Sequence, residues 1–250
     1  PMSMIAFRLA AFGFVDDMDY IQANEDCDSD NETLEEAKKG LNLWEGLLRT
    51  TGGAIEPTKS DWVRIGFEKV RGTWKFKKMN EDDEMKVRDT SGEEYPLEQL
   101  PVGTARLTLG VWQAVTGDET KEVDHLKEKI MHWKKKVWTS RLSQEEARCA
   151  VSTTIGKTLD YPLPATALTT KQCEEVTKEF LKVALPKSGI VRSAARDIVH
   201  TPEDILGFGF KDMETKQSIE HVMVMLDHGS RKTVTGRLLR ILAEGTLVEI

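Results

Sequence analysis

Two adjacent carboxylates, Asp16 and Asp17, follow an apolar stretch, and Asp19 comes directly after them. The approach, residues 4–14, carries Arg8 as its only charge, which is typical of a strand inside a sheet. A strand that delivers carboxylates to a tight turn can hold a divalent metal, because ions such as Mg²⁺ take oxygen ligands. Asp-Asp pairs are also common as plain turn residues that bond to the backbone. The order of the features that follow decides between these two interpretations.

A second run of acids imitates a calcium-binding loop. Asp26, Asp28 and Asp30 alternate as the first ligands of such a loop do, but Asn31 stands where the loop needs glycine and Ala37 where it needs glutamate. We therefore expect an exposed acidic loop there.

Cysteine and histidine offer no metal motif. The three cysteines, Cys27, Cys149 and Cys173, are far apart and odd in number, so they form neither a disulfide framework nor a Cys-x-x-Cys site. This usage favours a reducing, intracellular setting. His125 and His132 are seven residues apart and can share a helix face, but no zinc-type motif surrounds them.

The apolar periodicity predicts the elements that must position the acids. A strand over residues 4–15 and a short returning strand over residues 20–23 form a hairpin with the acids at its tip. An amphipathic helix follows over residues 33–51. Strands follow over 63–67, 73–77 and 104–111, and Gly110 near the end of the last one marks a bulge or a close approach of the backbone. From about residue 118 the pattern is helical, and helices are expected at 123–137, 143–159, 169–184, a short stretch after 201, 212–228 and 233–244, with 207–210 as a flexible break and Gly229 and Gly245 closing the last two helices.

The charge is unevenly distributed. The net charge is −7, and residues 1–60 hold 12 acids and 5 bases, whereas residues 121–141 hold seven bases and three acids. An acidic site followed by a locally basic helical region suits metal-assisted chemistry on a polyanion. A solvated helix face explains the same basic residues, so charge alone leaves both interpretations open.

The remaining bulk features bound the class of protein. No apolar run approaches the roughly 20 residues that a membrane span needs, and residues 4–14 lack a signal-peptide cleavage pattern. The chain begins with Pro1 rather than Met, so we expect it to be a piece of a longer protein.

Four features in order resemble the reverse transcriptase family. Phe14-Val15-Asp16-Asp17 is similar to its aromatic-x-Asp-Asp motif, Lys59-Ser60 to its lysine motif after the palm helix, and Leu109-Gly110-Val111 to its primer grip. Residues 130–142, Tyr161 and Phe180-Leu181 resemble the thumb and connector of non-LTR retrotransposon polymerases. The resemblance implies an α+β fold, with a partial palm of antiparallel strands and one packed helix over residues 1–115, a helical thumb over 116–200 and a helical C-terminal connector over 201–250.

The resemblance also implies an activity and its residues. The activity is RNA-directed DNA polymerisation, in which two Mg²⁺ or Mn²⁺ ions assist nucleotidyl transfer to a primer 3′-hydroxyl. An RNA template, a DNA primer and deoxynucleoside triphosphates are the implied partners. Asp16 would be a metal ligand with Asp17 beside it, Lys59 would stabilise charge or donate a proton near the triphosphate, and Leu109–Val111 would position the primer end. The phosphate contacts would come from basic residues of the first helical region of the thumb: Lys127, Lys134, Lys135, Lys136 and Arg141.

One part of the family pattern is missing. The fingers and an earlier palm strand with another metal-binding Asp precede the hairpin in these polymerases, and this chain begins too close to Asp16 to contain them. We therefore expect an incomplete metal site and no polymerisation by these residues alone. The alternatives are a non-catalytic, degenerate retroelement remnant that at most binds nucleic acid, and an unrelated α+β protein with a chance Asp-Asp turn. A retroelement origin would imply action in the nucleus.

Overall fold

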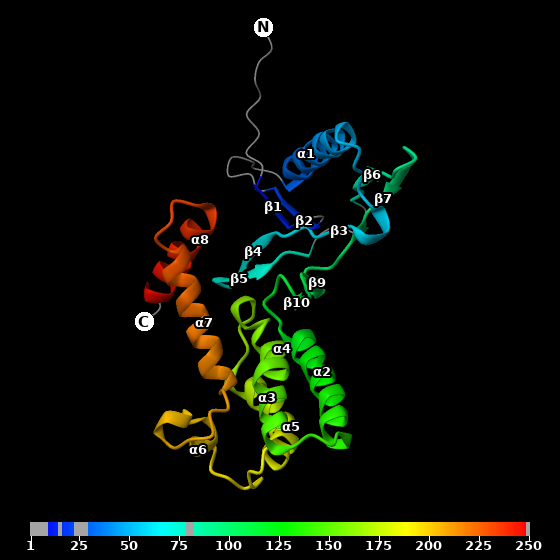
Figure 1. Ribbon diagram of the computed structural model, residues 1–250. Coiled ribbons are helices and arrows are strands. Elements are labelled where there is room, and N and C mark those ends of the chain that lie inside the picture. Colours follow the sequence, from blue (N-terminus) through cyan, green and yellow to red (C-terminus); the bar gives the residue numbers. More distant parts are fainter. Residues whose placement is uncertain (1–9, 15–16, 23–29, 79–82, 249–250) are drawn as a thin grey trace. The chain divides into compact units, whose positions relative to one another are not determined.

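The computed structural model describes residues 10–14, 17–22, 30–78 and 83–248. It combines helices with small, mainly antiparallel sheets, which confirms the mixture of helices and strands expected (Figure 1). The chain divides into two compact units, residues 1–104 and 105–250. This division comes earlier than the expected boundary at residue 115, because the last strand pair packs on the first helix of the second unit.

The first unit contains one long helix, α1 (Asp30–Thr50), and strands that pair two by two. Three of the pairs are antiparallel and one is parallel. The antiparallel pairs are β1 (Ala10–Phe14) with β2 (Asp17–Ile21), β4 (Phe67–Val70) with β5 (Thr73–Phe76), and β6 (Lys86–Arg88) with β7 (Glu94–Pro96); the parallel pair is β3 (Asp61–Trp62) with β8 (Glu98–Gln99).

Several expected bounds in this unit are wrong in detail. The hairpin is confirmed, but β2 begins at Asp17 rather than at residue 20, so Asp17 and Asp19, expected in or just past the turn, already belong to the returning strand. The first residues of the strand expected from residue 4 lie outside the described residues. Helix α1 begins at Asp30 rather than Thr33, where the acids of its first turn suit the helix dipole. The alternating stretch 63–66 is not a strand, and β4 starts at Phe67.

The core of the first unit lies between α1 and the short strands. Leu34 and Leu41 of α1 are buried with Trp62 of β3 and with Met85 and Val87 at β6. Glu45, also buried on α1, accepts the backbone N–H of Arg88 at 3.3 Å. Helix α1 thereby holds the β6–β7 pair by both an apolar and a polar contact.

The second unit is mainly helical. It opens with the antiparallel pair β9 (Arg106–Thr108) and β10 (Val111–Gln113). No helix that the structure describes combines the length and apolar character of a membrane span. The helices are α2 (Thr120–Thr139), α3 (Gln144–Ala150), α4 (Gly156–Asp160), α5 (Thr170–Lys187), α6 (Arg196–His200), α7 (Met213–His228) and α8 (Val234–Val248), and the π-helical segment Val151–Ile155 joins α3 to α4.

Helix starts in this unit follow the expected capping signals. Ser143 and Thr169 each form a complete capping box with the residue three positions later, which satisfies N–H groups that the first turn leaves open. The long apolar stripes over 123–137, 143–159 and 169–184 are confirmed as helices.

Other expectations for the second unit are wrong. Gly110 lies in the turn between β9 and β10 and is not a bulge. Residues 207–210, expected to be a flexible break, are held by backbone hydrogen bonds such as Phe210 N–H to Val199 O at 3.0 Å, and Phe210 is buried. The signals at Thr201 begin only a short 3₁₀ turn. Gly245 lies inside α8 and does not end it.

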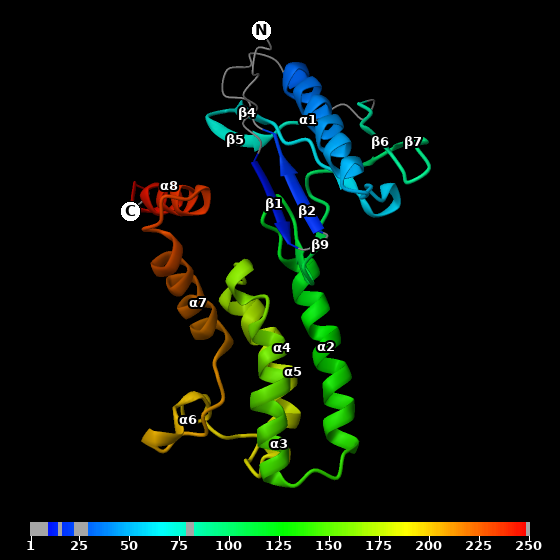
Figure 2. The same cartoon turned by 45° about the horizontal axis from the view of Figure 1, so that its top comes forward.

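The core of the second unit is built on the contact between α2 and α5. The two helices lie side by side in both views (Figures 1 and 2). Leu126 and Ile130 of α2 are almost completely buried with Leu159 of α4 and Val176 of α5. A second cluster around Ile155, Leu185 and Val199 continues the core towards α6.

Replacing Leu126 with alanine should lower the free energy of unfolding of the second unit by about 2–5 kcal/mol, because the substitution leaves a cavity in a close-packed core. Urea unfolding followed by far-UV circular dichroism measures the change. Met131→Ala on the same helix is the matched control, since Met131 is exposed and should change stability by about 0.5 kcal/mol or less. Equal effects of the two substitutions would contradict the assignment of the core.

Candidate functional site

The Asp-Asp hairpin is an antiparallel pair in regular register. Phe14 pairs with Asp17, Gly13 with Met18 and Phe12 with Asp19. Val15 and Asp16 stand between the paired ends; they lie outside the described residues, and Asp17 is described by its backbone alone. The tetrapeptide Phe14–Asp17 thus spans the connection between two paired strands.

The returning strand β2 is seated on α1 at a glycine. Gly40 is buried, and a β-carbon added there would overlap the Tyr20 hydroxyl and lie 2.9 Å from Cζ of its ring. The Tyr20 hydroxyl donates to Gln22 Oε1 at 2.9 Å, and Gln22 Nε2 donates to Glu36 Oε2 at 3.3 Å. Partial burial, and then the nearby Glu36 carboxylate, raise the pKa of Tyr20. Helix α1 therefore positions the hairpin through one aromatic ring and a short polar chain.

The other expected residues of the first unit are more open. Lys59 is exposed and ends a 3₁₀ turn, Pro57–Lys59, that Glu56 caps. Asp19 is exposed on β2. Among the residues that the structure describes, no group of three or more His, Cys, Asp or Glu side chains could hold a metal ion. Asp16 and the side chain of Asp17 lie outside the described part of the chain to which this finding applies.

The primer-grip-like segment is the tip of a strained hairpin. Leu109 and Gly110 connect β9 to β10, with φ values of 50° and 83°. Such a pair of positive φ values belongs to the tight hairpin turn that normally takes Asn-Gly. A leucine there is costly, yet the Leu109 side chain is 45% exposed. Burial of the Leu109 side chain therefore does not offset the strain of its backbone.

Two residues outside the expected primer-grip segment hold this hairpin. Glu122 is fully buried at the start of α2, and its Oε2 accepts the Trp112 N–H at 2.8 Å. The Tyr161 hydroxyl donates to the Leu109 carbonyl oxygen at 2.7 Å. Tyr161 was expected as part of the thumb-like region and its helix break, and Glu122 as one of the acids of a basic region, but neither was expected to contact the hairpin. The one sequence signal for the role of Glu122 was its position in the first turn of a helix whose other buried residues are apolar.

Two lysines of the basic helix α2 form ion pairs with glutamates of the neighbouring helix α5. Lys127 Nζ lies 2.8 Å from Glu175 Oε2, and Lys134 Nζ lies 3.0 Å from Glu179 Oε2. Hydrogen bonds from Lys182 and then Lys134 lower the pKa of Glu179 to about 2.

The rest of the expected phosphate contacts face solvent. Lys135, Lys136 and Arg141 are exposed, and the Lys136 ammonium lies 5.2 Å from the centre of the Trp133 ring. Of the five residues expected to contact phosphates, these three are presented most directly.

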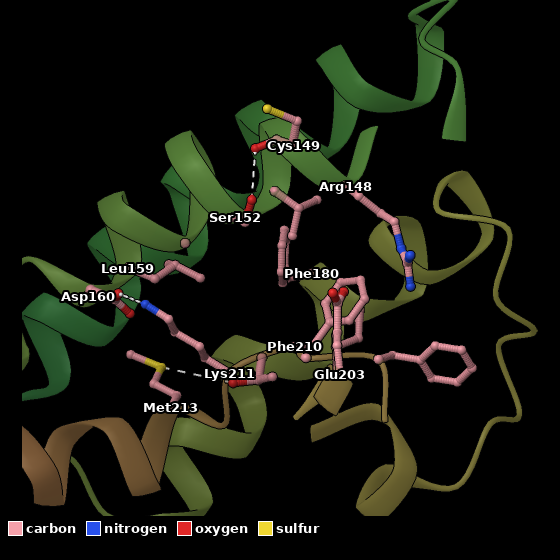
Figure 3. A pocket seen from close by; sticks show the side chains of 16 residues that line it. Arg148, Cys149, Ser152, Leu159, Asp160, Phe180, Glu203, Phe210, Lys211 and Met213 are labelled. Carbon is pink, nitrogen blue, oxygen red and sulfur yellow. Dashed lines mark hydrogen bonds and ion pairs between the residues drawn. The ribbon is translucent and has the colours of Figure 1, made fainter. Parts of the chain in front are cut away.

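A cavity of about 210 Å³ lies in the second unit (Figure 3). Phe180, Phe210 and Met213 are among its apolar lining residues, and the π-helical segment forms part of its wall. Nε of Arg148, which also lines it, is buried without a hydrogen-bond partner among the described residues. Charged side chains also line the cavity, namely Asp160, Glu203 and Lys211, and Lys211 Nζ lies 3.1 Å from Asp160 Oδ2. No sequence pattern predicts this cavity, because residues from four separate segments line it.

No family model matches the chain, and neither a curated protein nor a solved structure matches it.

Gly40→Ala should destabilise the first unit even though alanine favours a helix, because the new methyl group would displace the Tyr20 ring. We expect a loss of about 1–3 kcal/mol, the usual cost of overpacking. Gly46→Ala is the matched control on the same helix, since nothing lies within 4 Å of its added β-carbon, and it should gain about 0.5–1 kcal/mol. Urea unfolding of both variants is the measurement. Equal gains at the two positions would show that the hairpin is not seated on Gly40.

Leu109→Asn should stabilise the second unit by about 1 kcal/mol, because asparagine tolerates the left-handed conformation that leucine resists. Gly110→Ala should destabilise it by a similar amount for the opposite reason. Thermal and urea unfolding of the two variants check this. A loss of stability in Leu109→Asn would mean that the leucine side chain packs internally and is not held out for a partner.

Proposed function

We propose that this chain is the C-terminal part of a reverse transcriptase palm together with its helical thumb and connector. In the intact parent it would serve nucleotidyl transfer to a primer 3′-hydroxyl on an RNA template. The observation that carries the proposal is the register of β1 and β2, which sets Phe14–Asp17 across the connection of a hairpin. A chance Asp-Asp turn has no need of an aromatic residue paired directly with the second acid.

The way the hairpin is mounted supports the same function. Phosphoryl transfer depends on carboxylates whose position is fixed before the substrate arrives. Tyr20 packed against Gly40 ties β2 to a helix of 21 residues, so the acids are carried on a braced element. An acidic surface loop would not require that bracing.

The second motif supports it independently. A polymerase must hold the primer end by contacts that do not depend on base sequence. The Leu109–Gly110 turn presents backbone groups and an exposed leucine, and Glu122 and Tyr161 fix its position. A strained but well-supported tip is typical of a segment that grips a ligand.

The metal chemistry is proposed from the donor set. Adjacent carboxylates are the oxygen ligands that Mg²⁺ or Mn²⁺ prefers, and such ions when bound would supply charge stabilisation to the transferred phosphoryl group. Asp16 would be the main ligand and Asp17 the supporting one. A further acid from an earlier palm strand would be needed to complete the set, and for that reason we expect these residues alone to be inactive.

The basic face of α2 would follow the phosphates of the template–primer duplex. Lys135 and Lys136 on α2, and Arg141 just after the helix, are the exposed candidates. Lys127 and Lys134 would first have to leave Glu175 and Glu179. Surface pairs of this kind are worth about 1 kcal/mol or less, so a polyanion can compete for them. Binding through these residues would weaken as salt concentration rises.

Asp16→Asn in the parent protein, with the residues that precede this chain in its reading frame, should lower primer extension about a thousandfold. Loss of a metal ligand removes several kcal/mol of charge stabilisation. The measurement is incorporation of deoxynucleotides on an RNA template with a DNA primer and Mg²⁺. Asp19→Asn is the matched control: this neighbouring acid is exposed on β2 and its loss should change the rate by about twofold or less.

The chain alone, in the same assay, should extend no primer. Robust extension by these 250 residues would overturn the expectation of an incomplete site. Stop codons in the preceding frame, or equal rates for Asp16→Asn and the unchanged parent, would favour the non-catalytic remnant instead.

A further inference from the structure

The β4–β5 ribbon presents its side chains to solvent along its whole length. All eight residues of the two strands are exposed, including Trp74 at 66% and Phe67 at 60%. Single exposed apolar residues need no explanation, but several large rings gathered on one small element mark an interaction site.

The register places the rings on one face. Residues directly opposite each other in an antiparallel pair point to the same side, and Phe67 pairs with Phe76 while Lys69 pairs with Trp74. The two phenylalanine rings have centroids 5.1 Å apart. The Lys69 ammonium lies 5.9 Å from the centre of the Trp74 ring. One face of the ribbon therefore combines three aromatic rings with a cation.

The charge of the ribbon is opposite to that of the chain. Residues 67–78 hold five basic residues and one acid, Glu68, within a protein of net charge −7. An acidic peptide would match the charge but would leave the rings unused, and an apolar helix would match the rings but oppose the charge. A polyanion whose repeating units carry flat π-faces matches both.

We propose that the β4–β5 ribbon binds single-stranded nucleic acid, with bases stacked on Trp74 and Phe67 and phosphates beside Lys69 and its basic neighbours. Base stacking on aromatic side chains with a basic surround is the usual means of holding single strands. A duplex hides its base faces in its own stack, so it would not use the rings. This site does not rest on the polymerase proposal, whose nucleic-acid contacts lie on other elements.

The test uses the full chain and a fluorescein-labelled single strand of oligodeoxythymidylate or oligouridylate, with binding followed by fluorescence anisotropy. Trp74→Ala should weaken binding about tenfold or more, the usual effect of removing one stacked base contact. Trp74→Phe should retain most of the affinity. Lys69→Gln should lower the slope of log affinity against log salt by about 0.7, the value for one phosphate contact to a single strand.

Tyr95→Ala is the matched control. Tyr95 is also an exposed aromatic residue on a two-stranded ribbon of the same unit, but its hydroxyl bonds to Glu93 and its surroundings are acidic. It should leave binding unchanged, and far-UV circular dichroism should be the same for all variants.

Unchanged single-strand binding in Trp74→Ala would overturn the proposal. The proposal would also fail if the Lys135→Gln/Lys136→Gln variant lost single-strand binding while Trp74→Ala kept it, since that result would place the strand on α2. A primer–template duplex in the same assay separates the two proposals: Trp74→Ala should leave duplex binding intact, and the α2 variant should weaken it.

Discussion

Two paired strands bury too little surface to be stable by themselves, and every strand that the structure describes belongs to such a pair. Three of these pairs are held by contacts with a helix. Helix α1 braces β1–β2 through Tyr20 at Gly40 and braces β6–β7 through Val87 and Glu45. Helix α2 braces β9–β10 through Glu122. This dependence on helices explains why each unit presents its candidate residues on a separate two-stranded hairpin and not on one broad sheet.

Bracing also accounts for local costs in the structure. Glu122 buries a carboxylate whose Oε1 has no hydrogen-bond partner among the described residues, and Leu109 holds a positive φ. Burying a charge and straining a backbone are both unfavourable. Both costs fall on the same hairpin. The hydrogen bonds from the Trp112 N–H to Glu122 and from the Tyr161 hydroxyl to the Leu109 carbonyl fix the position of this hairpin.

The basic residues are used in two different ways. On α2, Lys127 and Lys134 bridge to carboxylates on α5, and these bridges join two helices that are already packed by Leu126 and Val176. On β4–β5, basic residues surround exposed rings. In the first arrangement the lysines are paired within the unit, and in the second the basic residues are exposed beside the rings. The net charge of the chain reveals neither basic region, because the excess of acids in residues 1–60 makes the whole chain negative.

The sequence by itself determined the long helices, the two capping boxes and the existence of the Asp-Asp hairpin, because apolar periodicity and capping are local properties of the chain. Only the tertiary structure decided that Gly110 makes a turn and not a bulge, that residues 207–210 are ordered against α6, and which lysines are paired. Each of these depends on a partner distant in sequence, such as Tyr161 for Leu109 or Glu179 for Lys134. Gly40 shows the reason most clearly. It must lack a side chain because the Tyr20 ring, twenty residues earlier, occupies that space, and no pattern within the helix predicts this contact.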